Sequence, residues 1–109
     1  MYRFILYITG GTSTSHLAVQ NLRALCQQWP PHSYALEIVD VLEDPERAER
    51  GKVIATPTLV RLSPEPTRRV IGDLSDTQRV MEGLELDPYR VNQTGRADDP
   101  AAESRLTNG

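Results

Sequence analysis

Cys26, His16 and His32 are the side chains of this sequence best suited to act as nucleophiles, bases or metal ligands. A lone cysteine cannot form an internal disulfide or a dithiol redox pair, and neither histidine stands at a ligand-like spacing from it. Cys26 also falls on the apolar side of a predicted helix, where a thiol usually serves as core packing. We therefore predict no dithiol redox chemistry, no metal site and no cofactor.

The segment 9–15 is the second candidate site, because Gly10, Gly11 and several hydroxyl side chains precede a predicted helix. A helix N-terminus can bind an anion, so a phosphate or a glutathione-like ligand is one interpretation. The other interpretation is an ordinary turn with a Ser or Thr cap, which we favour because the chain lacks G-x-x-x-x-G-K-[ST]. His16 has no Ser–His–Asp or Cys–His arrangement around it in the sequence, so it is expected to be an exposed helix residue. We predict no enzyme.

The charge distribution argues against nucleic acid and membranes as partners. Twelve basic and 15 acidic residues give a formal net charge of −3, which exerts no general pull on polyanions. The first ten residues contain an apolar run of only about five residues, too short to span a bilayer, and no signal-peptide pattern. We expect a cytoplasmic protein, and we interpret the polar run 43–52 and the pair Arg68–Arg69 as solvated faces.

The first half of the chain predicts strand, helix, strand and a short helix. Strand-forming residues fill 2–8, and a helix over about 14–29 has apolar residues at steps of three and four, ending at two prolines. Residues 34–41 alternate as a second strand, with Leu36, Ile38 and Val41 expected on one side. Asp44 caps a short polar helix that Gly51 ends. The order favours a parallel βαβ crossover.

The second half predicts a β-hairpin and a last helix. Residues 56–62 and 67–74 are apolar-cored runs separated by a proline-containing spacer, and Gly72 closes the second run. Ser75 is expected to cap a helix over 76–86, whose apolar stripe is weakened by Gly83. The polar residues 87–109 predict a disordered tail after a domain of residues 1–86. The complete order, βαβ, short α, ββα, is that of a thioredoxin-like α/β fold.

Three segments closely resemble the KaiB family of circadian clock proteins. They are Ile38-Val39-Asp40-Val41-Leu42, Ala55-Thr56-Pro57-Thr58-Leu59 and Arg68-Arg69-Val70-Ile71-Gly72-Asp73-Leu74-Ser75, in the family's order and spacing over residues 4–86. The resemblance implies a non-enzymatic regulator that binds the hexameric ATPase KaiC and, in some systems, sequesters KaiA or displaces a KaiB-like sensor kinase. It also implies a metamorphic chain, in which a homo-oligomer, a tetramer or a dimer, exchanges with a thioredoxin-like monomer that binds KaiC.

The same resemblance implies the site residues. The KaiC contact is expected at the short polar segment and the start of the next strand, with Lys52 as its charged residue. Glu37 stands where clock-type members often have lysine, on a surface used for KaiA. Gly10 and Gly11 are the next candidates for partner binding, although family members commonly have asparagine at the position of Gly11.

The candidates for cis-proline or fold-switching positions are Pro57, Pro64, Pro66 and Gly83. Pro57 retains the bend of the thioredoxin-like architecture, while the dithiol that it would face is absent. The family's usual proline triplet appears here as Pro64-Glu65-Pro66. One proline of that triplet is therefore missing, and the family's switching equilibrium does not carry over to this chain.

Two other function classes remain open at this point. A sensory input module is one, because KaiB-like domains also form the N-terminus of histidine kinases and the Pro-Glu-Pro spacer resembles theirs. A redox-inactive thioredoxin-like adaptor is the other, whereas a thiol or glutathione enzyme is disfavoured by the missing active-site cysteine. The sequence does not identify which KaiC paralogue is bound.

Truncation after Leu86 tests the predicted tail. Residues 87–109 bury too little apolar surface to offset their ordering entropy, so their removal should change the free energy of unfolding by less than about 0.5 kcal/mol. Urea denaturation measures this change, and size-exclusion chromatography should give the same oligomer for both chains. A loss of several kcal/mol or a changed oligomer would show that the tail docks on the domain.

Overall fold

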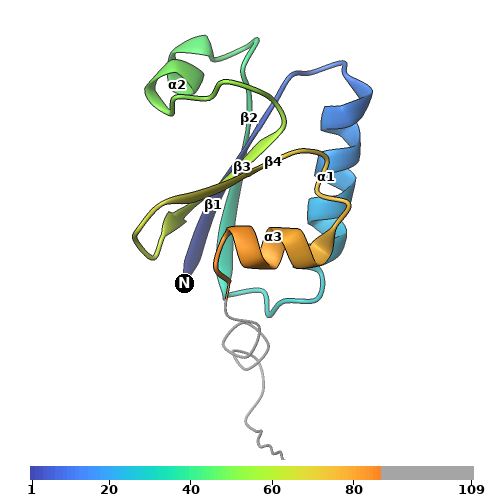
Figure 1. Ribbon diagram of the computed structural model, residues 1–109, viewed down its shortest axis with the longest axis vertical. Coiled ribbons are helices and arrows are strands. Elements are labelled where there is room, and N and C mark those ends of the chain that lie inside the picture. The colour runs from blue at the N-terminus through green and yellow to red at the C-terminus, as the bar shows by residue number, and fades with distance from the viewer. Residues whose placement is uncertain (87–109) are drawn as a thin grey trace, which may run out of the picture.

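The computed structural model describes residues 1–86 and contains seven elements in the predicted order (Figure 1). They are β1 (Tyr2–Ile8), α1 (Ser13–Cys26), β2 (Tyr34–Asp40), α2 (Pro45–Arg50), β3 (Thr58–Ser63), β4 (Arg68–Ile71) and α3 (Thr77–Gly83). The strands form one sheet in the order β2-β1-β3-β4, with β1 parallel to β2 and antiparallel to β3, and β3 antiparallel to β4. The predicted tail lies outside the described residues.

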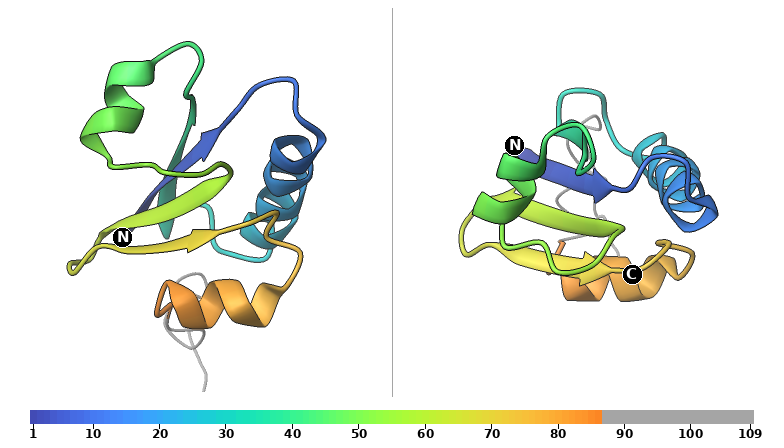
Figure 2. Two further views of the ribbon diagram at one scale, coloured as in Figure 1. Left: turned by 45° about the horizontal axis from the view of Figure 1, so that its top comes forward. Right: turned by 90° about the horizontal axis from the view of Figure 1, so that it is seen from above.

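The sheet separates α1 and α3 from α2 (Figure 2). Alternate residues of each strand point to opposite faces, so β1 contributes to two clusters of buried side chains. The larger cluster joins Tyr2, Phe4 and Leu6 of β1 to the apolar sides of α1 and α3. The smaller cluster, on the face of α2, contains Ile5, Tyr7, Val39 and Val60.

Helix α1 follows the predicted apolar pattern but ends earlier than expected. All five residues predicted to face the sheet are buried: Ala18, Leu22, Leu25, Cys26 and Trp29. The helix ends at Cys26, and the amides of Gln28 and Trp29 then donate to carbonyls three residues back. Pro30 and Pro31 explain this end, because a residue before proline is disfavoured in helical geometry and the last turn tightens.

Two further expectations were wrong in detail. Val41 packs with the cluster on the face of α2, whereas Leu36 and Ile38 pack on the opposite face. Side chains of a strand alternate between the two faces, and Val41 is an odd number of residues from both. Asp76, not Ser75, caps α3: its carboxylate accepts the amide of Arg79 at 3.1 Å. The amide of Ser75 instead donates to the side chain of Asp73, which places Ser75 in the preceding turn.

Gly83 lets α3 approach β4 closely. A Cβ atom at this position would lie 2.5 Å from a methyl group of Val70, so any larger residue forces the helix away from the strand. The helix also buries Val80 and Leu84 almost completely. The weak helix propensity of glycine is therefore offset here by close packing.

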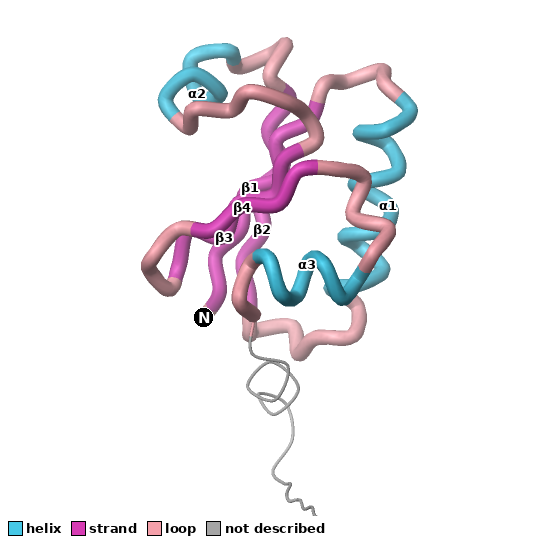
Figure 3. The backbone as a smooth tube through the Cα atoms, in the orientation of Figure 1, coloured by secondary structure: helices cyan, strands magenta, loops and turns pink. Residues whose placement is uncertain are grey.

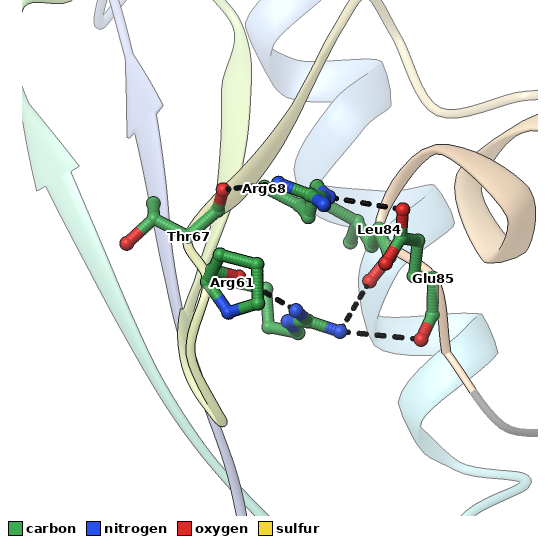
Figure 4. Close-up of polar contacts among 6 residues, drawn as sticks. Arg61, Thr67, Arg68, Leu84 and Glu85 are labelled. Atoms are coloured by element: carbon green, nitrogen blue, oxygen red, sulfur yellow. Dashed lines mark hydrogen bonds and ion pairs between the residues drawn. The ribbon is translucent and has the colours of Figure 1, made fainter.

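Arg61 is a buried charge on the core face of β3 (Figure 4). Only 4% of the residue is exposed, and its guanidinium donates to the carbonyls of Leu84 (2.8 Å), Glu85 (3.2 Å) and Pro66 (2.6 Å). Leu84 is the C-cap of α3, so two of these acceptors are carbonyls that a helix end leaves without an intrahelical donor. One side chain thus joins the end of α3 to the hairpin loop.

Arg68 lies directly opposite Arg61 in the pairing of β3 with β4. Two like charges at facing positions repel each other, and here the Glu85 carboxylate offsets the repulsion by an ion pair with Arg68 Nε at 3.0 Å. Arg68 was interpreted as a solvated residue, and its side chain is 38% exposed, but the fold also gives it this ion-pair partner. Both arginines therefore depend on the chain immediately after α3.

Arg61→Met tests this interaction. The substitution keeps an unbranched apolar stem but leaves three carbonyls without their donor, so we expect a loss of about 2 kcal/mol in the free energy of unfolding. Urea denaturation provides the measurement, and Arg79→Met on the exposed side of α3 is the matched control. Equal stability of the two variants would contradict a structural role for Arg61.

Candidate partner-binding surface

Helix α2 is anchored to the edge strand β2 by an ion pair. Arg47 of α2 donates through both terminal nitrogens to the carboxylate of Glu37, with Nη2 at 2.9 Å from Oε1. The hydrogen bond from Arg47 lowers the pKa of Glu37 below its ordinary value. Glu37 was predicted as a partner-binding residue, and the structure gives its charge a partner within the fold.

The remaining attachments of α2 are polar as well. Asp44 caps the helix by accepting the amide of Arg47, Pro45 is in its first turn, and none of the six helical residues is buried. Gly51 follows as the C-cap and ends the helix, as predicted. Only glycine fits here, because a Cβ atom would lie 2.6 Å from the hydroxyl of Tyr7. A helix held in this way presents nearly all of its surface to solvent.

Lys52 has a backbone conformation that usually belongs to glycine. The amide of Val53 donates to the carbonyl of Ala48 (3.0 Å) and that of Lys52 to Glu49 (3.0 Å), the pattern of a Schellman motif with Gly51 as C-cap. Lys52 therefore occupies the left-handed position, with φ of 56°. This conformation costs about 1–2 kcal/mol in a residue with a Cβ atom.

An exposed apolar side chain stands two residues further along. Ile54 is 89% exposed, and it lies on the rim of an open cleft of about 510 Å³ between α2 and the chain leading to β3. Thr9, Ala48 and Glu49 are among the residues that line this cleft. We refer to Lys52, Ile54 and this cleft as the α2–β3 surface.

The turn after β1 lies at the same end of the sheet (Figure 3). Its own cleft, of about 460 Å³, is lined by Gly10, Gly11 and His16 among others, and it shares Thr9 with the α2–β3 surface. The structure therefore brings three of the predicted binding residues, Lys52, Gly10 and Gly11, to one end of the molecule.

The fold favours glycine at both of these positions in the turn. The amide of Gly10 donates to Asp40 Oδ1 at 3.2 Å, and a Cβ atom at Gly10 would overlap the Asp40 carboxylate. Gly11 has φ of 86°, in the region that favours glycine. Thr12 caps α1 by accepting the amide of Ser15, so the start of the helix is satisfied within the fold. His16 is exposed, as expected.

The predicted fold-switching residues do not gather at one place. Pro57 precedes β3 and lies beside the α2–β3 surface in sequence, whereas Pro64 and Pro66 belong to the loop between β3 and β4. The peptide bonds before all three prolines are cis. Gly83 is on α3, against β4.

Cys26 is remote from these clefts, at the last residue of α1 on its core side. Burial raises the pKa of its thiol to about 11, and a hydrogen bond with Tyr34 offsets only part of that rise. The thiol is therefore protonated at neutral pH and is a poor nucleophile. Among residues 1–86, no group of three His, Cys, Asp or Glu side chains is placed to hold a metal ion.

Two features of this surface were missed by the sequence reasoning. Ile54 was not singled out, although its position ahead of an Ala-Thr-Pro turn was a signal that it precedes the strand. Arg69 was interpreted as solvated, yet its guanidinium donates to the carbonyls of Lys52 (3.1 Å) and Gly51 (2.9 Å). No signal in the sequence pairs Arg69 with a segment 17 residues earlier.

Comparisons with known proteins agree with this architecture. A family model described as the KaiB domain matches residues 5–86. The chain belongs to the KaiB family. It is 46% identical over 83 residues to the circadian clock protein KaiB3 of a Synechocystis strain, covering 76% of this chain and 81% of that protein. It is 47% identical over 85 residues to the circadian clock oscillator protein KaiB of a Prochlorococcus marinus strain, covering 78% and 73%.

Solved structures outside the KaiB clock proteins confirm the thioredoxin-like fold. Mitochondrial thioredoxin 3 from Saccharomyces cerevisiae matches with a TM-score of 0.64 at 21% identity, covering 77% of this chain and 76% of that one. The N-terminal domain of SasA from Synechococcus elongatus matches with a TM-score of 0.62 at 20% identity, covering 80% and 86%. The described part of the chain has no helix long and apolar enough to cross a membrane.

The thiol of Cys26 gives a pH-dependent prediction. With a pKa of about 11, roughly one thiol in a thousand is ionised at pH 8, so an aromatic disulfide reagent should react far more slowly than with free cysteine. The rate should rise as pH approaches 11 and should reach the free-cysteine rate after unfolding in urea. Fast reaction of the folded protein at pH 8, or turnover in an insulin-reduction assay, would contradict the assignment of Cys26 to the core.

Proposed function

We propose that this KaiB-family chain is a non-enzymatic regulator that acts in the cytoplasm by binding a KaiC-type hexameric ATPase through the α2–β3 surface. The observation that carries the proposal is the conformation of Lys52. A lysine occupies a left-handed position where glycine costs less, directly beside an isoleucine that is 89% exposed. Strained backbone of this kind clusters at functional sites. Leu74 and Glu85 share the conformation, but Leu74 is buried in the core and Glu85 pairs with Arg68, whereas Lys52 is exposed.

The surface has the composition of a small protein-binding site. The exposed Ile54 lines an open cleft, and Lys52, the only lysine in the chain, precedes it by two residues. The similarity to circadian clock proteins, at 46% and 47% identity, supports a place in a circadian or stress-response timing system. The same proposal includes binding of KaiA or of a sensor kinase. It also includes an exchange between oligomer and monomer that is accompanied by a change of fold.

A sensory input module is the second candidate. The observation in its favour is the likeness to the N-terminal domain of SasA, but at 20% identity this likeness concerns the fold alone. The much higher identity to the clock proteins named KaiB favours the regulator. Co-purification with candidate KaiC proteins in the presence of ATP tests for binding, and displacement of a KaiB-like sensor kinase from the ATPase by this chain would favour the regulator over the module.

Two substitutions of Lys52 separate binding from stability. Lys52→Glu keeps the left-handed strain and reverses the charge, so the melting temperature should stay nearly constant while affinity for the ATPase falls at least about tenfold, equivalent to ~1.4 kcal/mol. Lys52→Gly removes the charge and also relieves the strain, so it should stabilise the fold by about 1 kcal/mol while weakening the complex. Titration of labelled protein with the hexamer and ATP gives the affinities.

Arg79→Glu is the matched control for the charge reversal, because Arg79 is exposed on α3, on the other side of the sheet. It should bind as the wild type does. Size-exclusion profiles should be the same for all variants, which separates loss of contact from a shift between oligomers. Unchanged affinity of Lys52→Glu for an ATPase that binds the wild type would remove the α2–β3 surface from the contact.

A further inference from the structure

Arg69 joins β4 to the end of α2. Its Nη2 donates to the carbonyl of Gly51 at 2.9 Å and its Nη1 to that of Lys52 at 3.1 Å. These are the two carbonyls at the turn that ends α2, where a helix leaves its last acceptors without intrahelical donors. A guanidinium suits this position because its planar fork reaches two neighbouring oxygens and its charge complements the negative helix end.

The strand alternation directs Arg69 and its neighbour Arg68 to different helices. Arg69 is paired with Val60, which belongs to the cluster on the face of α2, whereas Arg68 is paired with Arg61 on the opposite face. Arg68 forms its ion pair with Glu85 beyond α3. Both arginines thus reach the chain that follows a helix, Arg69 by hydrogen bonds to two carbonyls and Arg68 by an ion pair with a carboxylate, and only Arg69 touches the α2–β3 surface.

Besides Arg69, the C-terminal end of α2 is fixed by the close approach of Gly51 to Tyr7 and by the packing of Val53 against the smaller cluster. None of the residues of α2 is buried, and its ion pair with Glu37 starts from Arg47, three residues into the helix. The turn must nevertheless hold Lys52 in the left-handed conformation, which a lysine does not prefer. The hydrogen bonds from Arg69 are compatible with that conformation, because both the Gly51 and the Lys52 carbonyls lie within reach of its guanidinium.

We infer that Arg69 is a positioning residue for the α2–β3 surface: it holds the turn that presents Lys52 and Ile54 to a partner, without contacting the partner itself. The effect on binding rests on the proposed function, whereas the effect on the turn does not. The effect on the turn can therefore be measured without a partner, and the effect on binding is measured with the ATPase.

The first test is amide hydrogen exchange of the isolated protein by NMR. In Arg69→Met the amides of Gly51, Lys52 and Val53, which close the turn, should exchange at least about tenfold faster than in the wild type, with the core strands unchanged. Arg69→Lys keeps the charge but lacks the fork, so its exchange should be intermediate. Arg68→Met is the control and should leave the three amides as they are. Unchanged exchange in Arg69→Met, or an equal effect of Arg68→Met, would overturn the inference.

The second test measures affinity for the KaiC-type ATPase with ATP. Arg69→Met should weaken binding several-fold, and adding it to Lys52→Glu should weaken binding by less than the sum of the two effects, because both act through one turn. Fully additive effects would mean that Arg69 contacts the partner. Faster amide exchange with unchanged affinity would mean that the turn does not matter for binding. Either result overturns the positioning role. If the wild type binds no such ATPase, the proposed function fails, and the exchange data still decide whether Arg69 holds the turn.

Discussion

Guanidinium groups of one hairpin satisfy the C-terminal ends of two helices on opposite faces of the sheet. Arg61 and Arg68 reach the end of α3, where Arg61 is buried and donates to three carbonyls, and Arg69 reaches the end of α2. A short helix gains little stability from its own hydrogen bonds, so its position depends on such tertiary contacts. The placement of both α3 and the α2–β3 surface therefore follows from the pairing of β3 with β4.

This arrangement connects the fold to the proposed binding site. Most of the apolar core lies between the sheet and the two helices α1 and α3, whereas α2 has no buried residue and is attached largely by polar contacts. The better-packed side supplies stability, and the other side presents a strained lysine and an exposed isoleucine to solvent. A KaiB-family chain built in this way can change its binding surface by substitution without disturbing its core.

Local signals in the sequence were sufficient for the order of the elements. Asp44, Pro45 and Gly51 marked α2, and the steps of three and four in α1 identified five buried residues. That order already indicated the thioredoxin-like topology, which the solved structures confirm. The errors concerned the ends of two helices: α1 ends before its two prolines, earlier than predicted, and Asp76 rather than Ser75 caps α3.

The long-range polar contacts were not predictable in the same way. Arg61 lies on the same side of β3 as Leu59, which faces the core, and this pattern signals a buried charge. Two of its three acceptors are more than twenty residues away in sequence, at the end of α3. Glu37 and Arg69 each acquire their partners only through the folded sheet. For the candidate site, the sequence and the resemblance therefore supplied Lys52 and the two turn glycines, and the structure supplied Ile54, the cleft and the contacts that hold them.

The single lysine permits a direct measurement of the proposed contact. An amine-acetylating reagent modifies Lys52 and the α-amino group of Met1, which lies at the opposite end of β1 and serves as an internal reference (Figure 1). Mass spectrometry gives the two rates with and without saturating KaiC-type ATPase and ATP. The account predicts that the complex slows acetylation of Lys52 at least about tenfold and leaves that of Met1 unchanged, since only a contacted amine is shielded. Equal rates at Lys52 in the free protein and in a demonstrated complex would contradict it.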